Sequence, residues 1–360
     1  MSKIRWFSII LLLALIPQFK VTGQDFKPGA GDPVILELLP VGGFEPVEAI
    51  GTYDPDDFFS ITRGGRPAPR VEKQDIYGRT LTDDFFYHRN NLNADEKLLY
   101  DQIYANAVEF NQNFMVQSYV PRKRIINITE AVRLDNPDLF WLQARISYSY
   151  GGDDHLTGMT ITFNSTAKNI EESKKIFNDA ANSVLQEAMN LPNEAEKIKF
   201  IHDWMTYFIT YQGTAPLNQS AYSAIVSGKT VCAGYSMAFT YFMQRLGIRS
   251  VVIHGRARGG RHSWNLVRID DKYYEMDVTW NNPNPKNPEE YNYDYFNITT
   301  EKISKSHTRD AFPNRTIPKA SGIKYSYPNY FGDSPGSDFS NLNYGYPNEQ
   351  LSPIYPNISK

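Results

Sequence analysis

The chain has 360 residues, a formal net charge of −3, and 41% hydrophobic and 14% aromatic residues. This apolar content is enough for the core of one large or two ordinary globular domains, and it excludes an intrinsically disordered chain. A mildly acidic charge argues against nucleic-acid binding, so we expect no nucleic-acid partner.

Residues 1–23 have the pattern of a secretory signal peptide. Lys3 and Arg5 precede an apolar run at residues 6–16, and small residues precede Gln24. The run is short for a membrane span, so we expect cleavage and no stable span afterwards, with an uncleaved anchor as the alternative. Cleavage removes three basic residues and lowers the formal net charge from −3 to −6. We therefore expect a secreted or cell-envelope protein, either periplasmic or extracellular.

The N-terminal third divides into a linker and a folded region. Residues 24–75 are rich in Gly, Pro and Asp and show no sustained periodicity, which predicts an irregular linker. We expect residues 76–192 to form an N-terminal domain of helices and one hairpin. Within it, Asn93 and Glu96 precede apolar positions at helical spacing and predict a capped amphipathic helix. Residues 125–134 fit either a helix or a strand.

A hairpin and two helices follow. Residues 140–150 and 159–163 alternate apolar and polar side chains on either side of a turn at Gly151-Gly152-Asp153, which predicts two paired strands. Helical spacing returns at residues 169–189, and another helix opens at Asn193 with a glutamate three residues later. These helices lead into the part of the chain that carries the candidate chemistry.

We expect the candidate catalytic residues to lie in a folded core at residues 193–310, and the chain after this core to form a tail. Residues 311–360 form a Tyr/Asn/Pro-rich tail, in which Gly and Ser are also frequent and aliphatic residues are scarce from residue 319 onward. Such a segment buries little aliphatic surface, so we expect it to be extended on the surface or disordered.

Cys232 is the only cysteine, so the chain cannot form an intramolecular disulfide. An unpaired thiol is unusual in an exported protein unless it is buried or used. Apolar positions at helical spacing follow it and end at Gly247, so Cys232 is expected at or just before a helix N-terminus. The unpaired N–H groups there favour a thiolate and could hold an oxyanion. The alternative use of a single cysteine is as a small buried hydrophobe.

Three extended segments follow, and their register decides which side chains meet. A tight turn at Asp270-Asp271 that pairs Ile269 with its neighbour Lys272 puts Asp277 opposite Trp264. His262 lies two residues from Trp264 on the same face, so Asp277 becomes its diagonal neighbour, about 7–8 Å away between backbones. A turn one residue longer would place Asp277 on the wrong face.

Cys232, His262 and Asp277 are therefore candidates for a nucleophile, a general base and a group that orients the imidazole. Each also has a structural alternative: His262 as a strand residue, and Asp277 as a cap of the turn that follows. The histidines His254, His262 and His307 could be imagined as metal ligands together with Asp277. No HxxxH, HxH or CxxC spacing is present, so we expect no metal and no other cofactor.

Three ordered blocks resemble the signatures of the transglutaminase-like superfamily. They read GKTVCAGY at residues 228–235, HSWNLV at 262–267 and YYEMDVTW at 273–280. The resemblance covers about residues 193–310 and, more loosely, the region from about residue 75, which is similar to that of secreted bacterial members. It implies an α+β fold with a papain-like core, in which a helix-borne cysteine packs against an antiparallel sheet, preceded by a mainly helical N-terminal region.

The resemblance also implies acyl transfer on amides through a thioester, with Cys232, His262 and Asp277 as the catalytic triad. Ala233 follows the cysteine, where the family often has a glutamine. The candidates for substrate binding or an oxyanion hole lie in or beside the three blocks: Ala233, Gly234, Tyr235, Trp264 and Tyr211.

We therefore expect an exported thiol enzyme that acts on a peptide or protein substrate, such as a cell-wall or surface protein. An amine acceptor would make it a cross-linking transglutaminase, and water would make it a deamidase or peptidase. The alternative is a non-catalytic binding or scaffold protein of the cell envelope that retains the fold.

Overall fold

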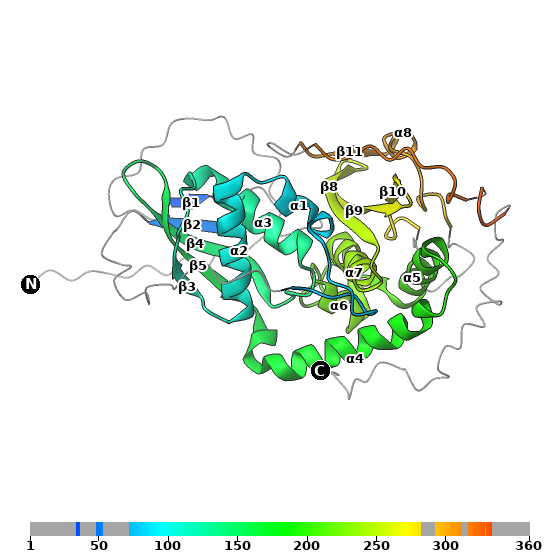
Figure 1. The fold of residues 1–360 in the computed structure, drawn as a ribbon, viewed down its shortest axis with the longest axis horizontal. Helices are drawn as coiled ribbons and strands as arrows, with labels where there is room; N and C mark the ends of the chain where they lie inside the picture. The colour runs from blue at the N-terminus through cyan, green and yellow to red at the C-terminus, as the bar shows by residue number, and fades with distance from the viewer. Residues whose placement is uncertain are drawn as a thin grey trace, which may run out of the picture.

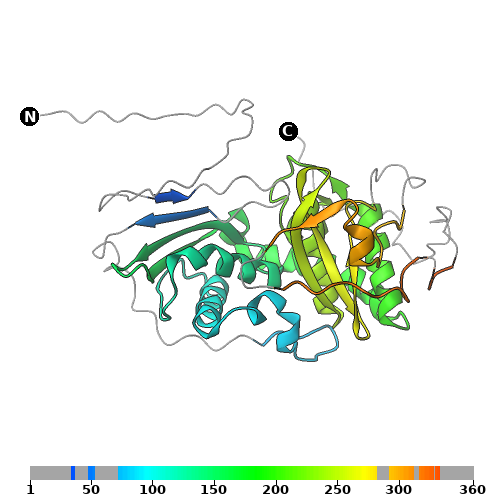
Figure 2. The same ribbon diagram turned by 90° about the horizontal axis from the view of Figure 1, so that it is seen from above.

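The computed structural model describes residues 72–281, 292–311, 316–327 and 329–332, and the backbone of two strands at 34–36 and 48–52. The expected signal peptide at 1–23 lies outside these residues. The described part is an α+β fold with two main sheets, which lie toward opposite ends of the molecule (Figures 1 and 2).

The first sheet has five strands in the order β1-β2-β4-β5-β3. Its strands are β1 (Val34–Leu36), β2 (Glu48–Thr52), β3 (Asn113–Met115), β4 (Leu142–Tyr150) and β5 (Leu156–Phe163). β4 and β5 form the predicted hairpin, whereas β2 pairs with β4 in parallel. The expectation of a wholly irregular segment at 24–75 is therefore wrong, because two short strands join the sheet through backbone hydrogen bonds. Strands this short leave no recognisable alternation in the sequence.

The described N-terminal region that contains this sheet also contains three α-helices before β4. They are α1 (Tyr87–Asn90), α2 (Ala94–Val108) and α3 (Ile125–Asp135). The predicted capping box of α2 is confirmed: Asn93 accepts from the Glu96 N–H, and the Glu96 side chain accepts from the Asn93 N–H. The segment that fitted a helix or a strand is the helix α3, which contacts α1 and α2.

Helices α4 (Ile170–Met189) and α5 (Glu194–Phe208) confirm the two helices predicted before the cysteine. Figure 1 shows α4 running along one side of the molecule from the five-stranded sheet toward α5. The expected boundary after residue 192 falls in the turn between them. One hydrophobic core nevertheless includes residues from both sides of that turn, such as Ile146 and Phe239.

The second sheet is antiparallel and has the order β10-β9-β8-β11. Its strands are β8 (Arg249–Ala257), β9 (Gly260–Ile269), β10 (Lys272–Met276) and β11 (His307–Arg309). Helix α7 (Cys232–Arg245) packs against β8 and β9, and it is buried continuously from Cys232 to Gln244. The predicted arrangement of a cysteine-bearing helix on an antiparallel sheet is confirmed.

Shorter elements complete the described part: β6 (Thr210–Tyr211), α6 (Ala221–Ile225), β7 (Lys229–Thr230) and α8 (Thr300–Ile303), with 3₁₀ turns at Asp83–Phe85, Arg122–Arg124 and Ser165–Asn169. Among the helices that the structure describes, none combines the length and apolar character that a membrane span requires.

The described part of the C-terminal tail, which we expected to be extended on the surface or disordered, has no helix or strand and is mostly exposed or half-buried, while several of its aromatic rings pack on the core. The Tyr327 ring stacks on Tyr293 with 4.2 Å between centroids, and Phe331 contacts Phe296 edge-on. The Gly322 N–H donates to the Tyr273 carbonyl. Aromatic rings can make such contacts because they bury large apolar areas even where aliphatic residues are scarce.

Candidate active site

Cys232 is the first residue of α7, and its N-cap is Val231 in extended conformation. Val231 supplies no side-chain acceptor to the first turn, so the N–H groups at the start of this helix remain available for a ligand. Those groups include the N–H of Ala233 and Gly234. The side chain of Cys232 is buried, with 1% exposure.

A close contact behind the cysteine requires the glycine at position 234. A Cβ atom built there would lie 1.8 Å from Thr230 Oγ1 and 2.9 Å from the Asn218 carbonyl oxygen. Thr230 Oγ1 is held in place because it donates to that carbonyl and also contacts the Ser223 hydroxyl. Gly234 thus lets the first turn of α7 approach the strand that leads to Cys232.

His262 lies on β9, directly opposite Gly255 on β8. A Cβ atom at position 255 would lie 2.1 Å from the Thr308 carbonyl oxygen of β11 and 2.6 Å from the Trp264 ring. Because position 255 has no side chain, β11 and the Trp264 indole can pack closely against β8 at this point.

The predicted register of β9 and β10 is confirmed, because Lys272 pairs with Ile269 and the pairing continues to Met276 and Asn265. Asp277 follows directly, and its Oδ2 atom lies 2.7 Å from Nε2 of His262. Asp277 also has the cap role given above as its alternative, because its Oδ1 accepts from the Trp280 N–H at 3.1 Å.

Cys232 faces the His262 ring from the side opposite to Asp277. The Cys232 side chain is within hydrogen-bonding reach of His262. Since Nε2 faces Asp277, the nitrogen left to face the sulfur is Nδ1. The structure thus brings the three residues predicted from the sequence into one connected row.

The electrostatics of this row favour a charged imidazole. Burial opposes the charged form of His262, but the Asp277 carboxylate and the neighbouring Cys232 outweigh it and raise the pKa of His262 to about 10. Burial likewise opposes ionisation of Asp277, yet His262 and His307 lower the pKa of Asp277 to about 2. At neutral pH the pair is therefore an imidazolium beside a carboxylate.

Tyr211, at the end of β6, is the predicted candidate that lies at the sulfur. Its side chain is within hydrogen-bonding reach of Cys232, and the residue is 52% exposed. Partial burial and the neighbouring Cys232 raise the pKa of Tyr211 to about 12, so the hydroxyl keeps its proton and can donate it.

The polar atoms of two other candidates, Tyr235 and Trp264, do not face the sulfur of Cys232. The Tyr235 hydroxyl donates to the Ile209 carbonyl inside the core. The Trp264 indole N–H donates to Glu275 at 2.8 Å, and the ring is 1% exposed. Both side chains support the site as packing residues, because their polar atoms are already bonded away from the sulfur.

The sequence suggests His307 beside Asp277 only as an imagined metal ligand, whereas the structure gives it a hydrogen-bonding role. Its Nε2 lies 3.0 Å from Asp277 Oδ2, and its Nδ1 lies 2.8 Å from the Ser306 hydroxyl. Only the pairing of β11 with β8 brings it here, 30 residues beyond Asp277.

A buried network on α5 holds the segment after Asp277. The side-chain amide of Asn281 contacts Nε2 of His202 at 2.9 Å, and its Oδ1 accepts from the Tyr295 N–H. Burial lowers the pKa of His202 despite its contact with Asp203, so His202 is neutral, accepts from Asn281 through Nε2 and donates to Asp203 through Nδ1.

His262, Asp277 and His307 are also the one group in the described residues whose ligand atoms could surround a metal ion, since these atoms lie within 4.8 Å of one another. They contact each other directly at 2.7 and 3.0 Å. A zinc ion with bonds of about 2.0–2.2 Å to all three would require them to move apart. The arrangement is that of a hydrogen-bonded carboxylate between two imidazoles.

Comparison with solved structures gives partial likenesses at low identity. A structure of a TGase is 16% identical over 46% of this chain and 50% of its own, with a TM-score of 0.27. A protein from Cytophaga hutchinsonii, described as a candidate cysteine protease, is 14% identical over 37% of this chain and 61% of its own, with a TM-score of 0.26. A structure of menin, titled for its binding site for Mixed Lineage Leukemia protein, is 24% identical over 31% of this chain and 27% of its own, with a TM-score of 0.25. The chain thus spans less than two thirds of each of these proteins.

No curated protein matches the sequence. The family model of the transglutaminase-like superfamily matches residues 182–278. Members of this superfamily are often cysteine-dependent acyltransferases or proteases, and the matched range contains Cys232, His262 and Asp277. The chain therefore carries a domain of the transglutaminase-like superfamily.

Proposed function

We propose that the protein is an exported thiol acyltransferase or hydrolase that acts on peptide or protein amides, with Cys232 as nucleophile, His262 as general acid and base, and Asp277 as the group that orients the imidazole. The observation that carries this proposal is that one buried imidazole lies within hydrogen-bonding reach of the only thiol and at 2.7 Å from a buried carboxylate. An imidazolium beside the sulfur favours the thiolate, which is the reactive form.

The reaction follows from these positions. The Cys232 thiolate attacks the carbonyl carbon of an amide and forms a carbon–sulfur bond, and the carbonyl electrons move onto oxygen. When that oxyanion collapses, the carbon–nitrogen bond breaks and His262 gives its proton to the departing nitrogen. Water or an amine then attacks the thioester, His262 takes up the proton of this nucleophile, and the thiolate leaves. An amine acceptor gives cross-linking, and water gives deamidation of a side chain or cleavage of the backbone.

The oxyanion needs donors near the sulfur, and two kinds are in place. The first-turn N–H groups of α7 point out of the helix N-terminus beside Cys232. The Tyr211 hydroxyl, which lies within hydrogen-bonding reach of Cys232, can supply a further donor from the open side.

The chemical state of the thiol tests this proposal. We expect iodoacetamide at pH 6 to alkylate Cys232 much faster than free cysteine, because the charged imidazole of His262 lies beside the sulfur. His262→Ala should reduce the rate to that of an ordinary thiol. The matched control is His155→Ala, which removes a histidine that pairs with Asp153 in the β4–β5 turn and should leave the rate unchanged.

The burial of Cys232 favours one alternative, a non-catalytic binding protein of the cell envelope that retains the fold. A wild-type alkylation rate no faster than that of free cysteine would support this alternative and refute the enzyme. Once a reactive thiol is established, incubation with a glutamine-containing peptide, with and without a primary amine, distinguishes transfer from hydrolysis through the mass of the product.

A further inference from the structure

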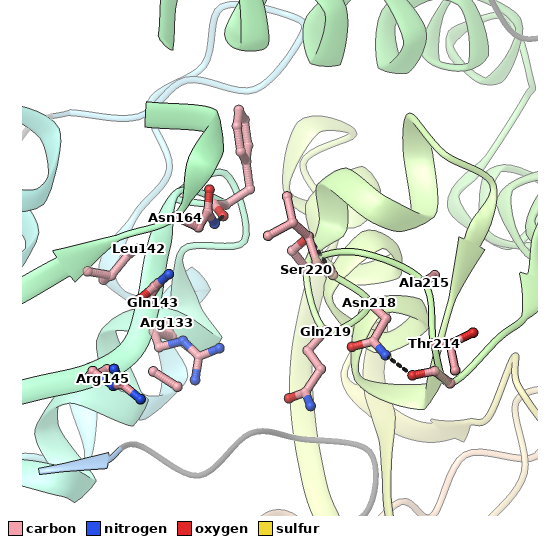
Figure 3. Close-up of a pocket in the computed structure, with 14 residues that line it drawn as sticks. Arg133, Leu142, Gln143, Arg145, Asn164, Thr214, Ala215, Asn218, Gln219 and Ser220 are labelled. Carbon is pink, nitrogen blue, oxygen red and sulfur yellow. Dashed lines mark hydrogen bonds between the residues drawn. The ribbon is translucent and has the colours of Figure 1, made fainter. Parts of the chain in front are cut away.

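A polar cavity of about 590 Å³ lies between β4 and the loop that connects β6 to α6. Its size falls within the range of ligand pockets, which is about 300–1,000 Å³. Figure 3 shows its two walls facing each other, with Arg133, Gln143, Arg145 and Asn164 on one side and Asn218 and Gln219 on the other.

The wall that carries the arginines is irregular. The pairing of β4 with β5 shifts register between Leu142 and Ile146, and the four consecutive residues 142–145 all line the cavity. Burial nevertheless alternates along this stretch, with Leu142 and Ala144 buried and Gln143 and Arg145 more exposed, so the two polar side chains share the face toward the cavity.

Two basic side chains stand among the described lining residues of the cavity. Arg133 and Arg145 both line it, and among the described lining residues there is no carboxylate. Arg133 is 9% exposed, and its guanidinium points into the space between the walls (Figure 3). Each guanidinium has five N–H donors, so it can hold a neighbour within the protein and a ligand carboxylate at the same time.

The opposite wall is bonded to the segment that precedes the candidate nucleophile. The Asn218 carbonyl accepts from the Val231 N–H at 3.0 Å and from the Thr230 hydroxyl. Val231 is the N-cap of α7, directly before Cys232. A ligand in the cavity therefore lies beside the loop that positions the first turn of α7.

We propose that this cavity binds an acidic segment of the polypeptide substrate, whose carboxylates bind Arg133 and Arg145 while the side-chain amides of Gln143, Asn164 and Gln219 bind its peptide groups. This inference rests on the proposed function, because it assumes that the amide to be attacked belongs to a peptide. It adds a preference for substrates with Asp or Glu a few residues from that amide, since an extended chain advances about 3.3–3.6 Å per residue.

Binding can be measured without turnover. The probes are two fluorescein-labelled peptides with a central glutamine, one with three aspartates on each side and the other with asparagine at the same positions. The protein is the full chain carrying Cys232→Ala, so that binding does not depend on whether the thiol is reactive. We expect this protein to bind the aspartate peptide at least tenfold more tightly than the asparagine peptide, since hydrogen bonds to charged groups are about twice as strong as neutral ones.

The variant that tests the site is Arg145→Gln, added to the Cys232→Ala protein, because Arg145 is exposed and its loss should leave the fold intact. It should remove most of the preference for aspartate, and Arg145→Glu should make the asparagine peptide bind more tightly than the aspartate peptide. The control is Lys272→Gln, which removes one exposed positive charge at the end of the β9–β10 hairpin away from His262 and should change nothing.

Equal affinity for the aspartate and asparagine peptides, no binding of either, or equal losses from Arg145→Gln and Lys272→Gln would each overturn the proposal. A protein with an ordinary thiol that still discriminates between the peptides through Arg145 would refute the enzyme and retain the acidic-peptide site. A reactive thiol in a protein that binds both peptides equally would support the enzyme and refute the acidic-peptide site.

Discussion

Nε2 of His307 lies 3.0 Å from Oδ2 of Asp277, the carboxylate oxygen that also contacts His262. The pKa of Asp277 is lowered to about 2, so the carboxylate is ionised at neutral pH and can only accept. His307 must then donate through Nε2, while its Nδ1 contacts the Ser306 hydroxyl. His307 is therefore a positioning residue that stabilises the charged form of Asp277.

We expect His307→Leu to reduce the alkylation rate of Cys232 at pH 6 by about tenfold, as the loss of a charge-assisted hydrogen bond would do. The acid limb of the rate–pH profile should move to higher pH, because His307 helps to lower the pKa of Asp277. His307→Gln keeps an N–H donor and should restore part of the rate. A purely structural role for His307 would lower stability in both variants and leave the profile of the folded protein unchanged.

The His262–Asp277 pair should also make stability depend on pH. The pKa of Asp277 falls on folding from 3.8 to about 2, so its contribution is complete above about pH 4 and is lost as the pH falls toward 2. The pKa of His262 rises from 6.5 to about 10, so its contribution is complete below about pH 6.5 and is lost as the pH rises through 10.

We therefore expect Asp277→Asn to lower the free energy of unfolding by about 3 kcal/mol between pH 4 and 6.5, as breaking a buried ion pair does. Denaturant unfolding of both proteins from pH 3 to 10 checks this, and the difference should shrink toward both ends. A difference that stays constant across this range would contradict the charged pair.

Tyr211→Phe removes one hydroxyl at the sulfur and keeps a ring that is half exposed, so the fold should be unaffected. If the hydroxyl donates to the oxyanion, kcat on a glutamine peptide should fall about 10²-fold while KM changes little. Alkylation by iodoacetamide forms no oxyanion, so its rate should change far less. Tyr207→Phe, on an exposed tyrosine of α5, is the matched control. An unchanged kcat would exclude Tyr211 as a donor.

Gly234→Ala should disturb the start of α7, because the new methyl group would meet Thr230 Oγ1 and the Asn218 carbonyl. We expect a loss of about 1–3 kcal/mol in the free energy of unfolding, together with slower alkylation of Cys232. Thr230→Ala in the same chain removes the nearer atom and should recover part of both. Gly260→Ala is the control, since its nearest contact is 3.7 Å away, and a loss equal to that of Gly234→Ala would contradict the steric explanation.

The sequence predicts the central part of the site because local signals determine it. The apolar spacing after Cys232 places it on a helix N-terminus, and the short turn at Asp270-Asp271 determines the register that brings Asp277 to His262. Both signals act within a few residues, where helix spacing and strand alternation are strongest.

The remainder depends on contacts between distant parts of the chain. His307 reaches Asp277 only after β11 pairs with β8, and Tyr327 reaches Tyr293 only after the segment following β11 folds back. Trp264 lies in a predicted signature block, but only the structure shows that Glu275 occupies its indole N–H. Such contacts leave no local pattern, because they depend on which surfaces the finished sheet exposes.

Gly255 contributes no side chain to the site, yet the position of β11 depends on it. A side chain there would meet the Thr308 carbonyl and the Trp264 ring and would push β11, with His307, away from Asp277. In a mutational scan selected for activity, position 255 should tolerate substitution as poorly as Cys232 itself. A map of intolerant positions would then mark this glycine as part of the active site, although its contribution is the absence of a side chain.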